Sequence, residues 1–224
     1  MLELSVSPNL IQQVYDRLLS AIIDHSLAPG ARIRQQELAE RLGVSRQPVS
    51  HALHLLHRQG LVAESGRKGF QVAPLDPERI RQVYEVRSAL DALAARLAAA
   101  RAACCAGDRA VLQTTLAAGG AVDAQTPLGD LIALDVDFHR ALYRLSGNPA
   151  IEEMAGPQWP HMRRSMAAVL TDTDYRTRVW AQHREIAGRV LAGDGPGAEG
   201  AAQAHALDAG RATEERLRSL QSAA

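Results

Sequence analysis

Aromatic residues are scarce in this sequence, at 4% of 224 residues, and lysine occurs only once, as Lys68. Alanine and leucine dominate the apolar residues, a composition that favours helix over sheet. The formal net charge is zero, so no overall field attracts nucleic acid or an anionic membrane surface. Any contact with DNA must therefore come from a local patch of basic residues.

Cysteine and long apolar runs are also nearly absent. The two cysteines, Cys104 and Cys105, are adjacent, which disfavours a disulfide between them and indicates a reducing compartment. We interpret both as small helix-packing residues. The sequence contains no apolar run of about 18 residues and no signal peptide. We therefore expect a cytoplasmic protein that has no membrane partner.

Residues 38–56 predict two short helices joined through a glycine. Gly43 follows the first helix, where a helix end needs a residue that tolerates positive φ. Ser45 is placed to cap the second helix, and Pro48 lies in its first turn. Polar residues at the start of that helix point outward: Arg46, Gln47, Ser50 and His54. Such a pair of helices suits the major groove of DNA, although any compact three-helix domain can contain one.

The flanking segments predict a winged domain. A helix is predicted over residues 9–25, and residues 26–33 form a loop. Residues 61–73 then predict a β-hairpin with Arg67 and Lys68 at its tip. A basic hairpin directly after such a helix pair is typical of a wing that meets phosphates or the minor groove. The alternative is an ordinary solvated turn.

The run PGARIRQQELAERLGVSRQPVSHALHLLHRQGLV, followed by GRKGFQVAPL, resembles the winged helix-turn-helix of the GntR superfamily of bacterial transcription regulators. The resemblance covers nearly all of residues 10–75 and implies binding to a double-stranded DNA operator. Family members usually carry Arg-Glu where this chain has Ser50 and His51, which removes a common DNA contact. Arg46 matches the neighbouring family arginine and is the better candidate. The candidate DNA-binding residues are Arg34, Ser45, Arg46, Gln47, Ser50, Arg67, Lys68 and Gly69.

Beyond the hairpin the sequence predicts helices alone. We assign residues 1–74 to the winged helix-turn-helix DNA-binding domain, residues 75–77 to a linker and residues 78–224 to an all-helical domain. The first long helix shows a stripe of apolar residues: Ile80, Val83, Val86, Leu90, Leu93 and Leu97. Six helices are predicted, over residues 78–103, 108–118, 128–146, 150–170, 175–192 and 197–220. The expected fold is mainly α, with an N-terminal winged helix-turn-helix and a C-terminal six-helix bundle.

Four residues of the helical domain have spacings that suit a metal site. Asp135 and His139 are one helical turn apart, so they share a helix face. His183 lies 12 residues before Gly195 and His205 lies 10 residues after it, so an antiparallel helical hairpin places both at one level. Imidazole suits Zn, Ni, Cu or Fe. The alternatives are an Asp135 paired with an arginine and histidines that are ordinary core residues.

The segments DVDFHRALYRLSGNPAI and HREIAGRVLAGDGPGAEGAAQAH are similar to the FCD effector domain of the FadR-type branch of that superfamily, in its VanR-like group. The resemblance implies a homodimer that holds a divalent metal, with Zn or Ni as leading candidates, through Asp135, His139, His183 and His205. It also implies a small organic or sugar acid as effector, bound by Arg87. A guanidinium binds a carboxylate through two parallel hydrogen bonds. The alternative is that Arg87 forms a surface ion pair with Asp91, four residues later.

We therefore predict a DNA-binding transcription regulator, without enzymatic activity, that is switched by a small carboxylate metabolite at a metal site. Two alternatives stay open at this point. The first is a regulator that senses the metal ion itself. The second is a metal-dependent hydrolase, which is disfavoured because Glu185 falls on roughly the opposite helix face from His183 and because hydrolysis gives no reason for a winged domain.

Overall fold

The structure is a computed structural model, and it describes residues 8–66, 69–123 and 125–222. Contacts divide the chain into two compact units, Met1–Leu75 and Asp76–Ala224. Each unit has its own core, so each is described by itself. Among the helices of the described ranges, none combines the length and the apolar character that crossing a membrane demands.

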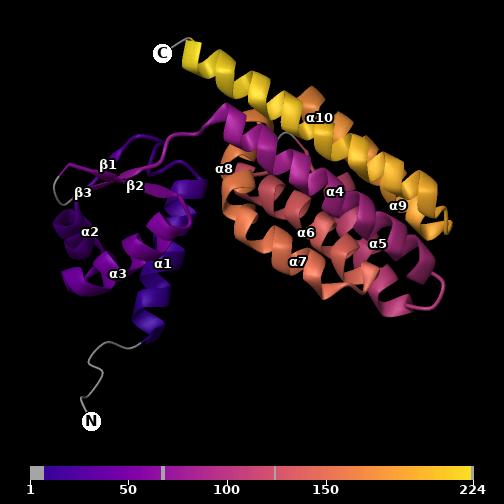
Figure 1. Ribbon diagram of the computed structural model, residues 1–224, viewed down its shortest axis with the longest axis horizontal. Helices are drawn as coiled ribbons and strands as arrows, with labels where there is room; N and C mark the ends of the chain where they lie inside the picture. Colours follow the sequence, from indigo (N-terminus) through magenta and orange to yellow (C-terminus); the bar gives the residue numbers. More distant parts are fainter. Residues whose placement is uncertain (1–7, 67–68, 124, 223–224) are drawn as a thin grey trace. The chain divides into compact units, whose positions relative to one another are not determined.

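The first unit packs short helices against a small antiparallel sheet (Figure 1). Its elements are α1 (Pro8–Ile23), β1 (Arg32–Ile33), α2 (Gln35–Leu42), α3 (Arg46–Arg58), β2 (Val62–Ser65) and β3 (Gly69–Val72). Strand β3 lies between β1 and β2 and pairs antiparallel with both. The core joins helices and sheet through residues such as Leu18, Ala39, Leu53, Leu56 and Phe70. The predicted winged helix-turn-helix fold is confirmed.

Two local predictions for this unit were wrong. Residues 32–33, predicted as loop, form β1 because their backbone pairs with β3. Ser45 directly precedes α3, but its side chain makes no capping hydrogen bond. A capping serine accepts from the second or third N–H of the helix, and Pro48, the third residue, has no N–H to offer. Gly43 adopts a φ of 66°, as predicted. Arg67 and Lys68 lie outside the described residues.

The second unit is a bundle of helices (Figure 1). Its elements are α4 (Pro77–Arg101), α5 (Ala106–Gly120), α6 (Leu128–Ser146), α7 (Pro149–Ala155), the 3-10 helix η1 (Gly156–Gln158), α8 (Trp159–Val169), α9 (Thr173–Leu191) and α10 (Gly195–Ser222). The mainly helical class is confirmed, but the single helix predicted over residues 150–170 is divided into α7, η1 and α8. Gly156 and Pro157 cause the division, because glycine weakens a helix and proline removes one of its hydrogen bonds.

Sequence-coded caps fix where several of these helices begin and end. The carboxylate of Asp76 accepts the backbone N–H of Glu78 at the start of α4. The carboxylate of Asp172 does the same for two N–H groups at the start of α9. At the end of α6, Gly147 takes a φ of 70°, a left-handed conformation that glycine adopts without a steric penalty. These signals position α6 and α9, which carry residues of the candidate site.

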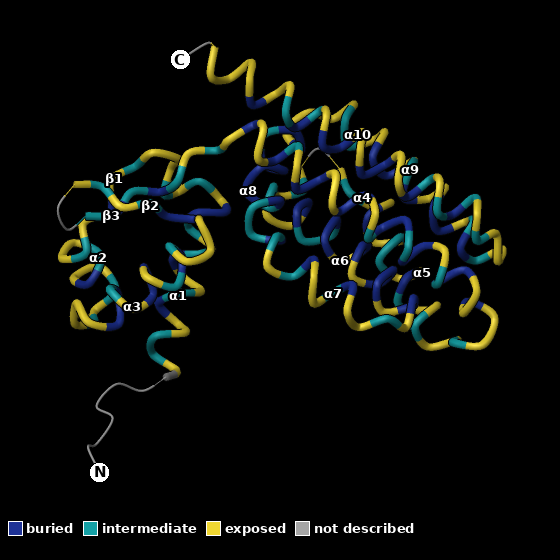
Figure 2. Tube along the Cα trace, viewed as in Figure 1, coloured by how far each residue is buried: buried dark blue, intermediate teal, exposed yellow. Residues whose placement is uncertain are grey.

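The buried face of α4 differs from the predicted one (Figure 2). Ile80 and Val83 are buried as expected, but Val86 is 63% exposed. The remaining stripe residues, Leu90, Leu93 and Leu97, are half-buried. The buried positions are instead small or polar: Arg87, Ser88, Asp91, Ala92, Ala94, Ala95, Ala98 and Ala99. Helix α10 packs along α4, and the small side chains of α4 allow that close approach. The alanine-rich face of α4 is therefore buried in place of the predicted leucine stripe.

Cys104 and Cys105 do not pack a helix interior, contrary to the prediction. They lie in the turn between α4 and α5, where Cys104 is exposed and Cys105 precedes the first residue of α5. Their Sγ atoms are 3.4 Å apart, and both thiols are free. The chain turns here because α4 ends at Arg101.

Candidate metal centre

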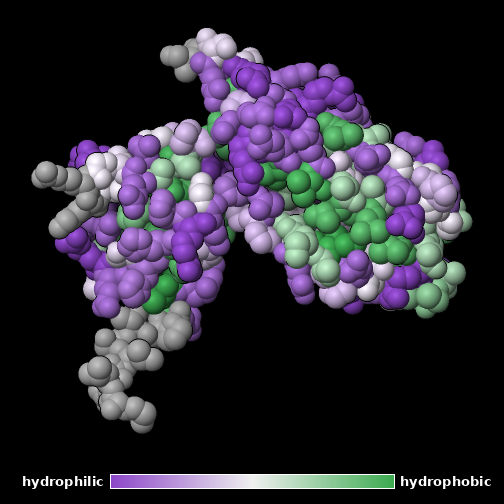
Figure 3. Space-filling view, in the orientation of Figure 1, coloured by the Kyte–Doolittle hydropathy of each residue, from purple (hydrophilic) through white to green (hydrophobic). Residues whose placement is uncertain are grey.

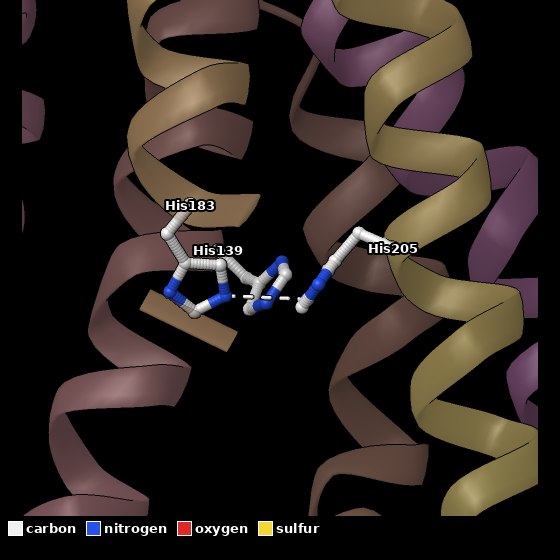
Figure 4. A group of neighbouring side chains, drawn as sticks. All are labelled: His139, His183 and His205. Carbon is white, nitrogen blue, oxygen red and sulfur yellow. Dashed lines mark hydrogen bonds between the residues drawn. The ribbon is translucent and has the colours of Figure 1, made fainter. Parts of the chain in front are cut away.

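Three buried imidazoles from three helices meet inside the second unit (Figure 4). They belong to His139 of α6, His183 of α9 and His205 of α10, and at most 2% of each residue is exposed. One ring nitrogen of each lies within 4.8 Å of the others. The Nε2 atoms of His183 and His205 are 3.2 Å apart, within a hydrogen bond. The two histidines therefore lie at one level, as their spacing from the turn between their helices predicted.

The turn between α9 and α10 produces this alignment. Gly193 takes a φ of 74° after the end of α9, a backbone conformation that favours glycine. Asp194 then accepts the backbone N–H of Gly197 in the first turn of α10, at 2.9 Å. Within the bundle the ring of Phe138 stacks on His183, with centroids 4.0 Å apart and an interplanar angle of 14°. The packing thus fixes the plane of the His183 ring.

Asp135 lies at the open side of the cluster. It precedes His139 by one turn of α6, and its carboxylate oxygens are 3.6 Å from Nε2 of His183 and 3.9 Å from Nε2 of His139. Its side chain is 10% exposed, against at most 1% for those two histidines. The structure therefore brings all four predicted ligand residues into one neighbourhood, with the carboxylate at its accessible edge.

Two of the imidazoles, those of His183 and His205, are held in the neutral form that metals bind. Burial lowers the pKa of His183 and of His205 well below 6.5, and the neighbouring imidazoles lower both further. Among the described residues, Nε2 of His139 has no hydrogen-bond partner, although it is buried. Leaving such an atom unpaired costs about 1–3 kcal/mol. Two neutral imidazoles and a third with an unpaired nitrogen make a donor set that suits a divalent transition metal.

The distances also suit a metal. Two nitrogen ligands of a tetrahedral zinc lie about 3.3 Å apart, because each bonds the ion at about 2.0–2.1 Å. The corresponding separation between His183 and His205 is 3.2 Å. The residues present therefore fit a divalent metal ion, held by the three histidines with Asp135 beside them.

Gln182 orients His205, a role that the sequence analysis missed. Its Oε1 lies 2.9 Å from Nδ1 of His205, and its Nε2 donates to Asp208 at 3.3 Å. Because a carboxylate only accepts, Asp208 fixes which end of the amide faces the histidine. The Nδ1–H of His205 then donates to Gln182, which leaves Nε2 with its lone pair. The only sequence signal for this contact is that Gln182 directly precedes His183.

Arg87 is buried beside the cluster rather than on the surface. Its Nε donates to Oδ2 of Asp91 at 3.2 Å, and the two side chains are 2% and 1% exposed. The predicted pair with Asp91 therefore exists, but the prediction that it lies on the surface is wrong. Burial alone would raise the pKa of Asp91, and the Arg87 guanidinium holds that pKa below its ordinary value. Among the described residues, Nη2 of Arg87 has no hydrogen-bond partner.

A small internal cavity connects Arg87 with the candidate ligands. Its volume is about 10 Å³. That is room for roughly one water. Its polar lining comes from Arg87, Asp135, His205, Tyr84 and Tyr175. A guanidinium thus lies at one side of this cavity, and candidate metal ligands lie at the other.

The predicted DNA-binding residues lie on the first unit. Arg34, Ser45, Arg46 and Gln47 are exposed, and Ser50 and Gly69 are half-buried. Arg46, Gln47 and Ser50 lie in the first turns of α3, whereas Arg34 precedes α2 and pairs with Glu37 at 2.7 Å. The first turns of α3 thus present a polar, partly basic surface.

Comparisons with known proteins agree with this architecture. Residues 10–72 match the model of bacterial regulatory proteins of the gntR family, and residues 82–209 match that of the FCD domain. The chain is 34% identical over 202 residues to an HTH-type transcriptional regulator from an unstable DNA locus of Streptomyces ambofaciens, covering 87% of this chain and 80% of that protein. It is 35% identical over 129 residues to the Nta operon transcriptional regulator of Aminobacter aminovorans, covering 56% of this chain and 59% of that protein.

Two solved structures share the fold. The Escherichia coli protein McbR/YncC matches with a TM-score of 0.74 at 23% identity, over 91% of this chain and 95% of that one. A putative transcriptional regulator GntR from Rhodococcus sp. RHA1 matches with a TM-score of 0.69 at 24% identity, over 92% of this chain and 97% of that one.

Proposed function

This chain belongs to the gntR family of bacterial regulatory proteins, and from that membership we propose that a small carboxylate at the histidine cluster sets its affinity for an operator. The protein is a DNA-binding transcription regulator with an FCD domain. Its relatives are transcription regulators and not enzymes, so the hydrolase alternative is dropped. The effector, the metal and the homodimer are parts of the proposal.

The observation that carries the proposal is the cavity between Arg87 and the candidate metal ligands. A bound divalent metal supplies a positive charge and an open coordination position to a carboxylate. At the other side of the cavity, Nη2 of Arg87 is available for a charge-assisted hydrogen bond. Because the cavity has room for about one water as it stands, the effector in this proposal is a short acid whose entry widens the space. Tyr84 and Tyr175 border the same space and offer hydroxyl groups to an oxygen substituent of such an acid.

A regulator that senses the metal ion itself is the second candidate. The observation in its favour is the narrowness of the cavity, which has room for about one water. In that case metal binding alone changes operator affinity, and organic acids add nothing. The two candidates share the ligands Asp135, His139, His183 and His205, and they differ in what Arg87 does.

We further propose that the regulator is a homodimer that pairs through α4. Its stripe consists of the exposed Val86 and the half-buried Leu90, Leu93 and Leu97. These residues repeat with steps of four, three and four, which is the spacing of a helix–helix seam. Figure 3 shows apolar side chains gathered over α4 and α5 on one face of this unit. A dimer places two copies of α3 on two half-sites, so the operator is expected to be nearly palindromic.

For DNA recognition we propose that α3 enters the major groove through its first turns. Arg46 and Gln47 are exposed there, and a guanidinium reads guanine through two hydrogen bonds. Arg34, Ser45, Ser50 and Gly69, with Arg67 and Lys68 of the hairpin, complete the proposed contact surface. Because the hairpin cations contact phosphates in this arrangement, they contribute to affinity rather than to sequence preference.

The deciding experiment is metal analysis followed by operator binding. Purified protein is assayed for bound metal, stripped with a chelator and reloaded with Zn²⁺ or Ni²⁺, and its thermal unfolding is followed by circular dichroism. We expect about one metal per chain and a higher unfolding temperature when it is bound, because a ligand at 100 times its dissociation constant adds about 2.7 kcal/mol. Operator binding is then titrated with a panel of organic and sugar acids.

His183→Ala and His205→Ala are expected to lose the metal and the acid response together. His161→Ala, on α8 and outside the cluster, is the matched control and is expected to keep both. An acid response that needs metal supports the leading proposal, and a metal response without any acid effect supports metal sensing. A chain that binds no Zn²⁺ or Ni²⁺ and gains no stability from either overturns both.

A further inference from the structure

Asp91 lies where α4 meets α6, between the candidate effector arginine and a candidate metal ligand. It is 1% exposed. Its Oδ2 is 3.2 Å from Nε of Arg87 and also 3.2 Å from Nδ1 of His139. Its Oδ1 accepts a short hydrogen bond from the hydroxyl group of Tyr143. Both carboxylate oxygens are therefore engaged: Oδ2 faces Arg87 of the cavity wall and His139 of the cluster, and Oδ1 faces Tyr143.

Helical spacing explains this arrangement. Arg87 and Asp91 are four residues apart on α4, and His139 and Tyr143 are four residues apart on α6. Each pair therefore projects from one face of its helix, and the two helices pack against each other. Asp135 extends the α6 face by another turn. One carboxylate from α4 thus meets two side chains of α6, those of His139 and Tyr143.

The contact between Asp91 and His139 is incomplete as it stands. The separation of Nδ1 and Oδ2 is that of a hydrogen bond, yet neither ring nitrogen of His139 makes one with any described residue. The distance between Nδ1 and Oδ2 suits a hydrogen bond, but the ring is not oriented to direct an N–H at Oδ2. A turn of the imidazole about its bond to Cβ changes that direction while Asp91 stays fixed by Arg87 and Tyr143.

We propose that Asp91 is a positioning residue that couples the metal ligand His139 to the effector arginine Arg87. In this role it accepts the Nδ1–H of His139, which fixes the tautomer that presents Nε2 to the metal. Through its other contacts it holds the Arg87 guanidinium so that Nη2 remains available to the cavity. The inference rests on the proposed function, because it assigns a role relative to that metal and that effector.

A consequence is reciprocal coupling between the two ligands. Occupation of His139 by a metal orders the Nδ1–H bond to Asp91, and Asp91 orders Arg87, so a carboxylate meets a guanidinium already in place. Because such coupling is a free energy shared by both sites, the acid must raise metal affinity by the same factor by which metal raises acid affinity. A buried ion pair that only supports the fold has no such effect.

The test uses the full-length protein, with Co²⁺ as the probe metal and acetate as the probe carboxylate. Co²⁺ affinity is measured from its visible absorption between pH 6 and pH 8, with and without acetate. Asp91→Asn is expected to lower Co²⁺ affinity about 10–100-fold and to abolish its dependence on acetate. Asp137→Asn, an exposed aspartate on the same helix as His139, is the matched control and is expected to behave as wild type.

Removing one partner of a buried ion pair can unfold a protein, so a second variant is included. Arg87→Met combined with Asp91→Asn removes both charges and keeps the volume of the site. It is expected to fold, to bind Co²⁺ as weakly as Asp91→Asn, and to show no acetate effect. Wild-type Co²⁺ affinity in either Asp91 variant overturns the proposal.

The tautomer of His139 supplies a measurement that needs no metal. In ¹⁵N nuclear magnetic resonance spectra of the metal-free protein at pH 7.5, wild-type His139 is expected to carry its proton on Nδ1, and Asp91→Asn is expected to shift it toward Nε2. A wild-type Nε2–H tautomer overturns the role of Asp91. If wild-type protein takes up no Co²⁺, the proposed metal site fails, and the spectrum still decides whether Asp91 orients His139.

Discussion

The Nε2 atoms of His183 and His205 share one hydrogen bond of 3.2 Å in the interior of the helical unit. Gln182 accepts the Nδ1–H of His205, so Nε2 of His205 has no proton and acts as the acceptor. His183 must then donate from its own Nε2. Both rings are neutral in this arrangement, and a proton added to either one places a charge in a buried site.

The first prediction concerns the stability of the metal-free protein in acid. The pKa values of His183 and His205 lie well below 6.5 in the folded protein, and unfolding returns them to about 6.5. Above that pH both histidines are neutral in the folded and the unfolded protein, so neither makes the free energy of unfolding depend on pH. As pH falls from 6.5 to the folded-state values, each histidine shifts the equilibrium toward unfolding by roughly tenfold per pH unit. Urea unfolding in the presence of a chelator, repeated between pH 7 and pH 5.5, measures the slope of the unfolding free energy against pH. His183→Asn is expected to reduce it, and an unchanged slope contradicts the assignment.

The second prediction concerns the approach of α10 to α4. A Cβ at Gly210 would lie 2.6 Å from Cβ of Tyr84, which cannot move away without its helix. Gly210→Ala is therefore expected to destabilise the protein by about 1–3 kcal/mol. Gly200→Ala, in the same helix with open space around it, is expected to stabilise by about 0.5–1 kcal/mol. Equal effects in denaturant unfolding would show that α10 does not pack this closely.

The third prediction concerns operator reading by α3. Arg46→Ala is expected to weaken specific DNA binding by about 1–3 kcal/mol. Ser50→Arg is expected to change operator preference more than folding, because serine cannot make the two hydrogen bonds to guanine that arginine can. Binding-site selection with both proteins measures the preference. If the selected motif is identical, residue 50 does not contact bases.

The fourth prediction separates the charge of Arg87 from its shape. Arg87→Lys keeps a cation beside the buried Asp91, so the fold and the metal content at saturating metal are expected to survive. Lysine cannot form two parallel hydrogen bonds to a carboxylate, so the acid response is expected to disappear. Isothermal titration of metal-loaded protein with the active acid reports this. A wild-type response places Arg87 outside effector binding.

The fifth prediction concerns the stripe on α4. Val86→Glu is expected to shift a dimer toward monomers, because it places a charge in the proposed seam, and to leave folding intact, because Val86 is 63% exposed. Met154→Glu on α7, where the native residue is 65% exposed, controls for adding a charge at an exposed apolar position. Sedimentation velocity compares the two. Dimers of unchanged stability in Val86→Glu would exclude this face.

Local sequence signals were enough to predict most of the helices and the four candidate metal ligands. The left-handed φ of Gly43 was predicted from that residue alone. The turn at Gly147 and the caps at Asp76 and Asp172 are also set by single residues, although the sequence analysis did not name them. The meeting of His183 and His205 follows from nearly equal distances to one turn, 12 residues before Gly195 and 10 after it, which depend only on helix rise. These features need no knowledge of how distant helices pack.

Features that depend on packing between helices were not accessible in this way. The stripe containing Val86 has the apolar period of a buried face, yet the alanine face of α4 is buried because α10 approaches it closely. The contact between Asp91 and His139 depends on the register of α4 against α6, and the contact between Gln182 and His205 depends on the register of α9 against α10. The register of α4 against α6 is not encoded by a local pattern, and the turn between α9 and α10 sets the level of their residues without showing which side chains meet. The buried state of Arg87 follows from the same cause.

The two tryptophans of this chain both lie against the histidine cluster. The ring of Trp180 is 4.8 Å from that of His183, and the ring of Trp159 is 6.3 Å from that of His139. Both are buried. All of the tryptophan fluorescence of the protein therefore arises beside the candidate ligands, where a paramagnetic ion such as Cu²⁺ or Ni²⁺ would quench it. The unmodified chain thus contains an optical reporter of its own site, readable without any label.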